Sequence, residues 1–98
     1  MALKIQWTKR AEKSFDKIVE YLEEEWSEAS AKKFVRKTDK LLGQIAENPE
    51  MCPAVEGKED VRKGLVTKQT SVFYRIMDNI IRLITFWDNR RDPDKLKI

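Results

Sequence analysis

The feature of the 98-residue sequence that most constrains its fold is a block of three strand-like runs in the C-terminal half. The runs cover residues 61–67, 70–77 and 80–87 and are rich in Val, Ile, Phe, Tyr and Trp, the residue types that favour strands. Asp78-Asn79 suits a two-residue hairpin turn, because both residues tolerate positive φ better than most. The block therefore predicts an antiparallel meander of three strands.

The N-terminal half is expected to contribute one more strand and two helices. Apolar and polar residues alternate over 3–7, as in a half-buried strand. Two segments then repeat apolar residues every three or four positions. The first begins after Thr8, which can cap a helix, and the second begins at Ser27 or Ser30 and ends before Pro49. These segments predict an antiparallel helical hairpin.

The remaining segments carry little periodicity. Residues 50–60 contain Pro53 and Gly57 and are predicted to form a loop, and the polar tail over 88–98 is predicted to be irregular. A chain of this length buries one core, so residues 1–98 are predicted to form a single domain. We expect an α+β fold of β-α-α-β-β-β order, with the helical hairpin packed on a four-stranded antiparallel sheet.

The hairpin register predicts that both faces of this sheet are apolar. A two-residue turn pairs Met77 with Ile80, Ile76 with Ile81, Arg75 with Arg82, Tyr74 with Leu83 and Phe73 with Ile84. One face then carries Phe73, Met77, Ile80, Ile84 and Phe86. The other carries Val72, Tyr74, Ile76, Ile81, Leu83 and Trp87. Two short helices cover only one face, so we expect something else to cover the second.

The same register places two cations opposite each other, Arg75 and Arg82. Like charges in this position cost up to about 1 kcal/mol unless an anion lies between them. The pair therefore predicts a bound carboxylate or phosphate. The alternatives are that each guanidinium pairs with an acidic residue of this chain, or that the turn is longer.

The charge of the chain is positive and unevenly distributed. The net charge is +3, and residues 58–98 hold ten basic and six acidic side chains. Such a field favours nucleic acid or an acidic protein segment as partner, although a solvated surface has the same composition. The sequence has no apolar run long enough to span a bilayer and no secretory signal, which predicts a cytoplasmic protein without a membrane partner.

The composition excludes several kinds of catalytic site. The sequence contains no His, which removes the usual nucleophilic triads and most transition-metal sites, and its three Gly are scattered, which removes phosphate-binding loops. A lone Cys52 cannot form an internal disulfide. We therefore expect no metal and no cofactor. What remains is phosphodiester chemistry carried by Arg, Lys and Tyr, or binding alone.

Four stretches carry a resemblance to a known family. They are Trp7-Thr8-Lys9-Arg10-Ala11, Val61-Arg62-Lys63-Gly64-Leu65-Val66, Val72-Phe73-Tyr74-Arg75-Ile76 and Trp87-Asp88-Asn89-Arg90-Arg91-Asp92-Pro93. Together with the order of strand, two helices and three strands, they make the chain resemble the RelE/ParE toxin superfamily of type II toxin–antitoxin systems. The resemblance implies a bacterial toxin of the plasmid-stabilisation type, which inhibits growth. It also implies that the toxin forms a hetero-oligomer with a cognate antitoxin.

The resemblance leaves the target open. ParE-like members poison DNA gyrase without being enzymes themselves, whereas RelE-like members are metal-free endonucleases that cleave mRNA on the ribosome. This chain departs from the nuclease pattern at two positions, with Ser71 in place of an Arg and Leu96 in place of an aromatic residue. We therefore favour the gyrase inhibitor. The alternatives are the mRNA endonuclease and a non-toxic protein- or RNA-binding module of the same fold.

The candidate site residues are cations of the strands and the tail, with one tyrosine. If the chain is an RNase, its catalytic candidates are Arg62, Lys68, Arg90 and Tyr74. Tyr74 lies among apolar positions in the predicted register, so a core role is the alternative for it. The candidates for binding the target or its phosphates are Arg62, Lys63, Lys68, Arg75, Arg82, Arg90 and Arg91. Lysines at strand ends also guard sheet edges, which is the alternative for Lys63 and Lys68.

Overall fold

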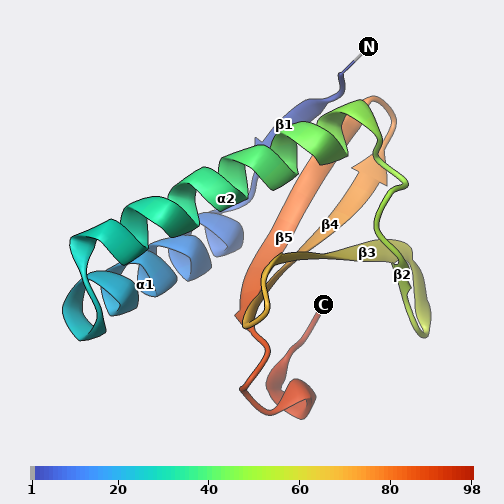
Figure 1. The fold of residues 1–98 in the computed structure, drawn as a ribbon. Coiled ribbons are helices and arrows are strands. Elements are labelled where there is room, and N and C mark those ends of the chain that lie inside the picture. The colour runs from blue at the N-terminus through green and yellow to red at the C-terminus, as the bar shows by residue number, and fades with distance from the viewer. Residues whose placement is uncertain (1) are drawn as a thin grey trace.

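Two antiparallel helices pack on one face of a five-stranded sheet in the computed structural model, which describes residues 2–98 (Figure 1). The elements in chain order are β1 (Lys4–Trp7), α1 (Lys9–Glu25), α2 (Glu28–Glu47), β2 (Ala54–Val55), β3 (Lys58–Thr67), β4 (Thr70–Met77), β5 (Ile80–Asp88) and one turn of 3-10 helix (Pro93–Lys95). The predicted α+β class is confirmed, as are the helical hairpin and the three-stranded meander.

The sheet differs from the prediction in strand number and direction. Its order is β1-β5-β4-β3-β2, and the edge strand β1 pairs in parallel with β5. The prediction of a four-stranded antiparallel sheet is therefore wrong, although β3, β4 and β5 do pair antiparallel. Alternating side chains show that a segment is a strand, but they carry no information about the direction of its neighbour.

The additional strand lies in the segment predicted as a loop. β2 pairs with β3, which begins at Lys58 rather than at Val61. Gly57 turns the chain between them with a φ of +82°, a conformation that side chains other than glycine rarely adopt. Most residues of this hairpin are exposed and polar, so no apolar alternation marks it in the sequence.

Both helices begin where the sequence predicts. The Thr8 side chain accepts a hydrogen bond from the Ala11 backbone N–H at 3.0 Å, and Ser27 accepts one from the Ser30 N–H at 3.0 Å. Each cap satisfies a backbone donor that the first helical turn leaves without a partner. Thr8 also donates to the Leu83 carbonyl oxygen at 2.7 Å, which fixes the start of α1 to β5.

The β4–β5 register confirms four of the five predicted pairs, and Asp78 adopts the expected positive φ in the turn, at 54°. The fifth pair is wrong, because Phe73 lies opposite Thr85 rather than Ile84. Ile84 is an extra residue that forms a bulge in β5. The sequence pattern gives no sign of this bulge.

The bulge reverses the side-chain alternation beyond it. Phe86 pairs with Val72 and belongs to the core, not to the face of Phe73 as predicted. Trp87 pairs with Ser71 on the face away from the helices, not among the core residues. The backbone N–H of Phe86 donates to the Ser14 hydroxyl of α1 at 2.9 Å, so a helix side chain satisfies this donor at the bulge.

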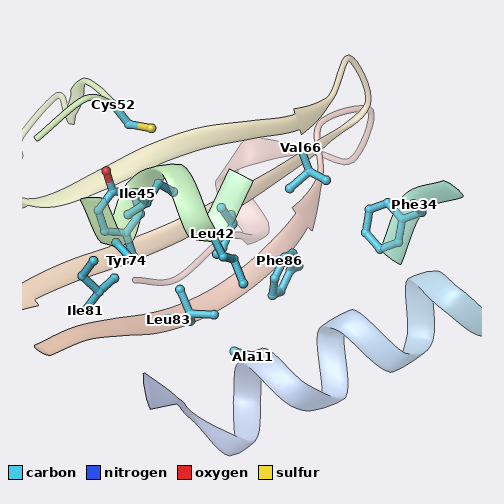
Figure 2. Close-up of a cluster of buried hydrophobic side chains, with 12 residues drawn as sticks. Ala11, Phe34, Leu42, Ile45, Cys52, Val66, Tyr74, Ile81, Leu83 and Phe86 are labelled. Atoms are coloured by element: carbon cyan, nitrogen blue, oxygen red, sulfur yellow. The ribbon is translucent and has the colours of Figure 1, made fainter. Parts of the chain in front are cut away.

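The core lies between the helices and the sheet (Figure 2). Its buried members are Ala11, Phe34, Leu42, Ile45, Ala46, Cys52, Val66, Val72, Tyr74, Ile81, Leu83 and Phe86. Four aromatic rings form its centre near α1: Phe15 lies 5.2 Å from Trp7, 5.4 Å from Phe34 and 5.2 Å from Phe86, measured between ring centroids. These rings fix α1 and α2 to the end of β5.

The second face of the sheet is partly apolar and receives the C-terminal tail. Val61 and Phe73 are buried outside the main core, whereas Leu65 and Met77 on β3 and β4 are 60% and 41% exposed. Ser71 donates to the Asn89 side-chain oxygen at 2.8 Å, which fixes the start of the tail. Figures 1 and 2 show the tail on the side of the sheet away from α2.

Candidate functional site

A groove of ≈ 1210 Å³ lies between the helical hairpin and the end of the meander. One wall comes from α1 and the start of α2. The other comes from the β3–β4 turn, the end of β5 and the first residues of the tail. Its floor includes Ile18, Leu22, Phe34 and Phe86, which are also residues that hold the helices on the sheet.

The rim of the groove is strongly basic. Six cations come from the helices, namely Lys9, Arg10, Lys13, Lys17, Lys33 and Lys37. Three more, Lys68, Arg90 and Arg91, come from the opposite wall. Asp88 is the one acidic residue among those lining it, so nine positive charges and one negative charge give a local charge of +8. The whole chain carries +3, so the rest of the molecule carries −5.

Asp88 organises the two arginines of the tail. Its carboxylate accepts two hydrogen bonds from the Arg90 guanidinium, at 3.0 and 2.8 Å, and one from the Arg90 backbone N–H at 2.9 Å. These bonds hold the pKa of Asp88 below its usual value. Arg91 instead lies over the Trp87 ring, 4.6 Å from its centroid. The adjacent arginines therefore point to different neighbours, and Arg91 keeps its charge free of any acidic partner in the described chain.

Arg62 is placed in a different environment from the tail arginines. Its guanidinium donates to the carbonyl oxygens of Cys52, at 2.6 Å, and Glu50, at 3.2 Å. These bonds hold the segment after α2 against β3. The side chain also lies outside the basic groove, so the structure does not bring Arg62 together with Lys68 or Arg90.

Tyr74 is a core residue. Its side chain is fully buried, and its hydroxyl donates to the Pro49 carbonyl oxygen at 2.8 Å. Figure 2 shows the ring inside the core with its oxygen directed toward the segment after α2. Burial raises the pKa of this phenol well above its ordinary value. A proton donor or acceptor for catalysis requires exposure and a pKa near the working pH, and Tyr74 has neither.

The raised pKa of Tyr74 predicts a loss of stability in alkali. A phenol whose pKa is higher in the folded state favours folding below its unfolded pKa of about 10, and this contribution is lost as the pH rises toward the folded value. We expect the free energy of unfolding to fall by up to about 1.4 kcal/mol per pH unit above that point. Urea denaturation between pH 8 and 11 measures it. Tyr74→Phe should show a shallower slope, and equal slopes in both proteins would contradict the expectation.

The remaining strand cations lie on the second face of the sheet. Arg75 pairs with Asp60, with 3.0 Å between Nε and the nearer carboxylate oxygen, and Arg82 donates to the Gln6 side-chain oxygen at 2.8 Å. Each guanidinium therefore has a partner within the chain. No bound anion is needed between Arg75 and Arg82 to offset the repulsion of their charges. Lys63 lies within β3 rather than at its end, with its Nζ 5.9 Å from the Phe73 ring centroid.

The groove joins only part of the predicted set and adds residues that the sequence analysis did not single out. Lys68, Arg90 and Arg91 line it, whereas Arg62, Lys63, Arg75 and Arg82 do not. The added residues are the cations of α1 and α2. The spacing of Arg10, Lys13 and Lys17 was the available signal, because positions three and four apart share one side of a helix.

Two other kinds of feature are absent from residues 2–98. No group of three or more Cys, Asp or Glu side chains has an arrangement that could hold a metal ion. None of the helices in this range combines the length and the apolar character needed to cross a membrane.

Comparison with known proteins identifies the family. A family model described as the ParE toxin of type II toxin–antitoxin systems, parDE, matches residues 5–93. The chromosomal ParDE system from P. aeruginosa has a solved structure that is similar to this chain, with a TM-score of 0.73, 16% identity and coverage of 89% of this chain and 96% of that one. No curated protein matches the sequence.

Two further solved structures share the fold. The YoeB/ParE toxin from Agrobacterium tumefaciens has a TM-score of 0.64 at 13% identity, over 88% of this chain and 98% of that one. The E. coli DinJ-YafQ toxin–antitoxin complex has a TM-score of 0.62 at 13% identity, over 92% and 96%. The matched family model covers β1 except for Lys4, both helices, the whole meander and the arginines of the tail. The chain therefore belongs to the family of ParE toxins of type II toxin–antitoxin systems.

Proposed function

We propose that this toxin acts by inhibiting DNA gyrase and is not a nuclease. The observation that carries the proposal is the environment of Tyr74. It is the one tyrosine of the meander, and it is buried with its hydroxyl bound to the Pro49 carbonyl. The chain has no His, so the side chain most often used for general acid–base catalysis is missing as well.

Other positions of the nuclease pattern support the same proposal. Ser71 is fully buried, and its hydroxyl donates to the Asn89 side chain, so it is not available to RNA. Arg62 is held by two backbone carbonyls outside the groove. Leu96, in the tail, has no group that can donate a proton. None of these three positions therefore supplies an acid or a base that could act on a phosphodiester.

The toxin is proposed to bind a cognate antitoxin in a hetero-oligomer. Structures with the same fold include a ParDE system from P. aeruginosa, the E. coli DinJ-YafQ complex and a heterotetrameric YoeB-YefM complex from Staphylococcus aureus. The exposed Leu65 and Met77 side chains on the second face of the sheet are consistent with a partner that covers apolar surface.

The test compares the two targets with the same purified chain. One reaction contains gyrase and plasmid DNA, and the other contains ribosomes programmed with a defined mRNA. We expect loss of supercoiling and accumulation of cleaved DNA in the first reaction, with intact mRNA in the second. Addition of the cognate antitoxin should prevent the effect on gyrase.

Two other outcomes would overturn the proposal. Ribosome-dependent fragments of mRNA with unaffected gyrase would make the chain an endonuclease. No effect in either reaction would make it a binding module. An Arg91→Gln variant tests one predicted target contact, and Lys95→Gln, an exposed tail residue outside the groove, is its charge-matched control.

A further inference from the structure

We propose that the basic groove between α1, α2 and the end of the meander binds the phosphate backbone of nucleic acid. This binding goes beyond the proposed inhibition of gyrase: Arg91 is common to both, whereas the helix cations of the groove play no part in the proposed function. It starts from the segregation of charge, with +8 along the groove in a chain whose net charge is +3. A concave surface of one sign concentrates the field and attracts a ligand with many charges of the opposite sign.

The helix cations form two rows, one on α1 and one on α2, and the remaining groove cations face them from the opposite wall. Arg10, Lys13 and Lys17 follow one side of α1, and Lys33 and Lys37 follow one side of α2. Residues three or four apart are about 5–6 Å apart on a helix surface, so these charges repeat at regular intervals along the groove. Lys68 and the tail arginines face them from the other wall. A chain of regularly spaced anions fits this arrangement better than a single small anion.

These cations are almost entirely uncompensated within the chain. In the part of the chain that the structure describes, Arg90 is the one groove cation with a carboxylate partner, and that partner is Asp88. The other eight remain free to release counterions to a polyanion, which is the main source of affinity in binding to nucleic acid backbones.

The type of cation favours nucleic acid over an acidic protein segment. Six of the nine groove cations are Lys and three are Arg. Protein–protein interfaces are depleted in Lys and enriched in Arg, because a strongly hydrated ammonium is costly to desolvate. A phosphate backbone is bound with its water largely retained, and Lys serves there as a point charge.

Exposed aromatic side chains complete the groove. Trp26 is 70% exposed and Tyr21 is 44% exposed, and both line it beside the basic rows. An exposed tryptophan at the end of a helix has no role in the core of this chain. Basic grooves that carry aromatic rings are typical of surfaces on which unpaired bases stack while cations follow the backbone.

The experiment measures binding of the purified chain to fluorescently labelled oligonucleotides by anisotropy. A 20-nucleotide single strand and the matching duplex are titrated at 50 to 300 mM salt. We expect the affinity for at least one of them to fall with salt, with a slope of about −3 to −5 on logarithmic axes, as for about four to six phosphate contacts. No binding of either oligonucleotide at the lowest salt would overturn the proposal.

A pair of charge-matched triple variants tests the location. Lys13→Gln, Lys17→Gln and Lys33→Gln together remove three groove cations, and we expect them to weaken binding at least about tenfold and to reduce the slope by about 3. The control combines Lys4→Gln, Lys40→Gln and Lys58→Gln, three exposed lysines outside the groove. Equal losses in both triples would show that net charge, and not the groove, is responsible.

Two further measurements identify the ligand. Trp26→Ala should weaken binding of the single strand by about five- to a hundredfold and leave the duplex unaffected if bases stack on this ring. If Trp26→Ala binds the single strand as tightly as the natural sequence does, and both proteins prefer the duplex, the ligand is the duplex backbone. Poly-glutamate that displaces the oligonucleotide at equal charge concentration would show that the groove accepts acidic polypeptide as well, and would overturn the assignment to nucleic acid.

Discussion

Replacing Phe86 by alanine is expected to lower the free energy of unfolding by about 3–5 kcal/mol, the largest effect of any single truncation considered. The ring is 2% exposed, and its centroid lies 5.4 Å from Trp7 and 5.2 Å from Phe15. Its removal leaves a cavity where β1, α1 and β5 meet, and the neighbouring rings fill that space only in part. Urea denaturation measures the loss, and a melting temperature more than about 10 °C lower should accompany it.

The matched control for this truncation is Leu65→Ala. Leu65 is 60% exposed on the face of the sheet away from the helices, so its substitution should change the free energy of unfolding by no more than about 0.5 kcal/mol. A Phe86→Ala protein that unfolds at nearly the same urea concentration as the control would show that Phe86 is not the centre of the core.

The second large effect is expected at Thr8, where one hydroxyl joins two elements. The Thr8 oxygen accepts from the Ala11 N–H of α1 and donates to the Leu83 carbonyl oxygen of β5. Thr8→Val keeps the shape of the side chain and loses both hydrogen bonds, which should cost about 1–3 kcal/mol in unfolding free energy.

Thr8→Ser is the control for this substitution, because it retains the hydroxyl that makes both bonds. Its free energy of unfolding should stay within about 0.5 kcal/mol of that of the natural sequence, since Ser and Thr are similarly effective helix caps. Comparable losses in the serine and valine variants would indicate that the γ-methyl group of Thr8 matters more than its hydrogen bonds.

Local chemistry in the sequence was sufficient to predict most elements of the fold. The caps at Thr8 and Ser27, the turn at Asp78 and the first four pairs of the hairpin depend on residues close in sequence. The bulge at Ile84 depends instead on α1, whose Ser14 hydroxyl accepts from the Phe86 N–H. The parallel pairing of β1 with β5 likewise depends on contacts between the two ends of the chain, and periodicity does not report such contacts.

The candidate site was less predictable than the fold for the same reason. The β3–β4 turn with Lys68 and the tail with Arg90 form one wall of the groove, and α1 and α2 form the other. These segments are far apart in sequence, so the sequence alone does not show that they meet. The row of Arg10, Lys13 and Lys17 on α1 is visible in the sequence. That it lines a groove becomes clear only from the wall opposite, which the sequence does not show. For Tyr74, by contrast, apolar neighbours in the predicted register already favoured the core role that the structure confirms.

The parallel pairing of β1 with β5 also sets the order in which the molecule can be assembled during translation. Thr8 and Leu83 are 75 residues apart, so the first strand has no neighbour to pair with until the residues of β5 have left the ribosome. Contacts of such separation slow folding, because a long loop must close before they form. A newly made copy therefore carries an unpaired first strand until β5 has been synthesised, and its sheet is completed only then.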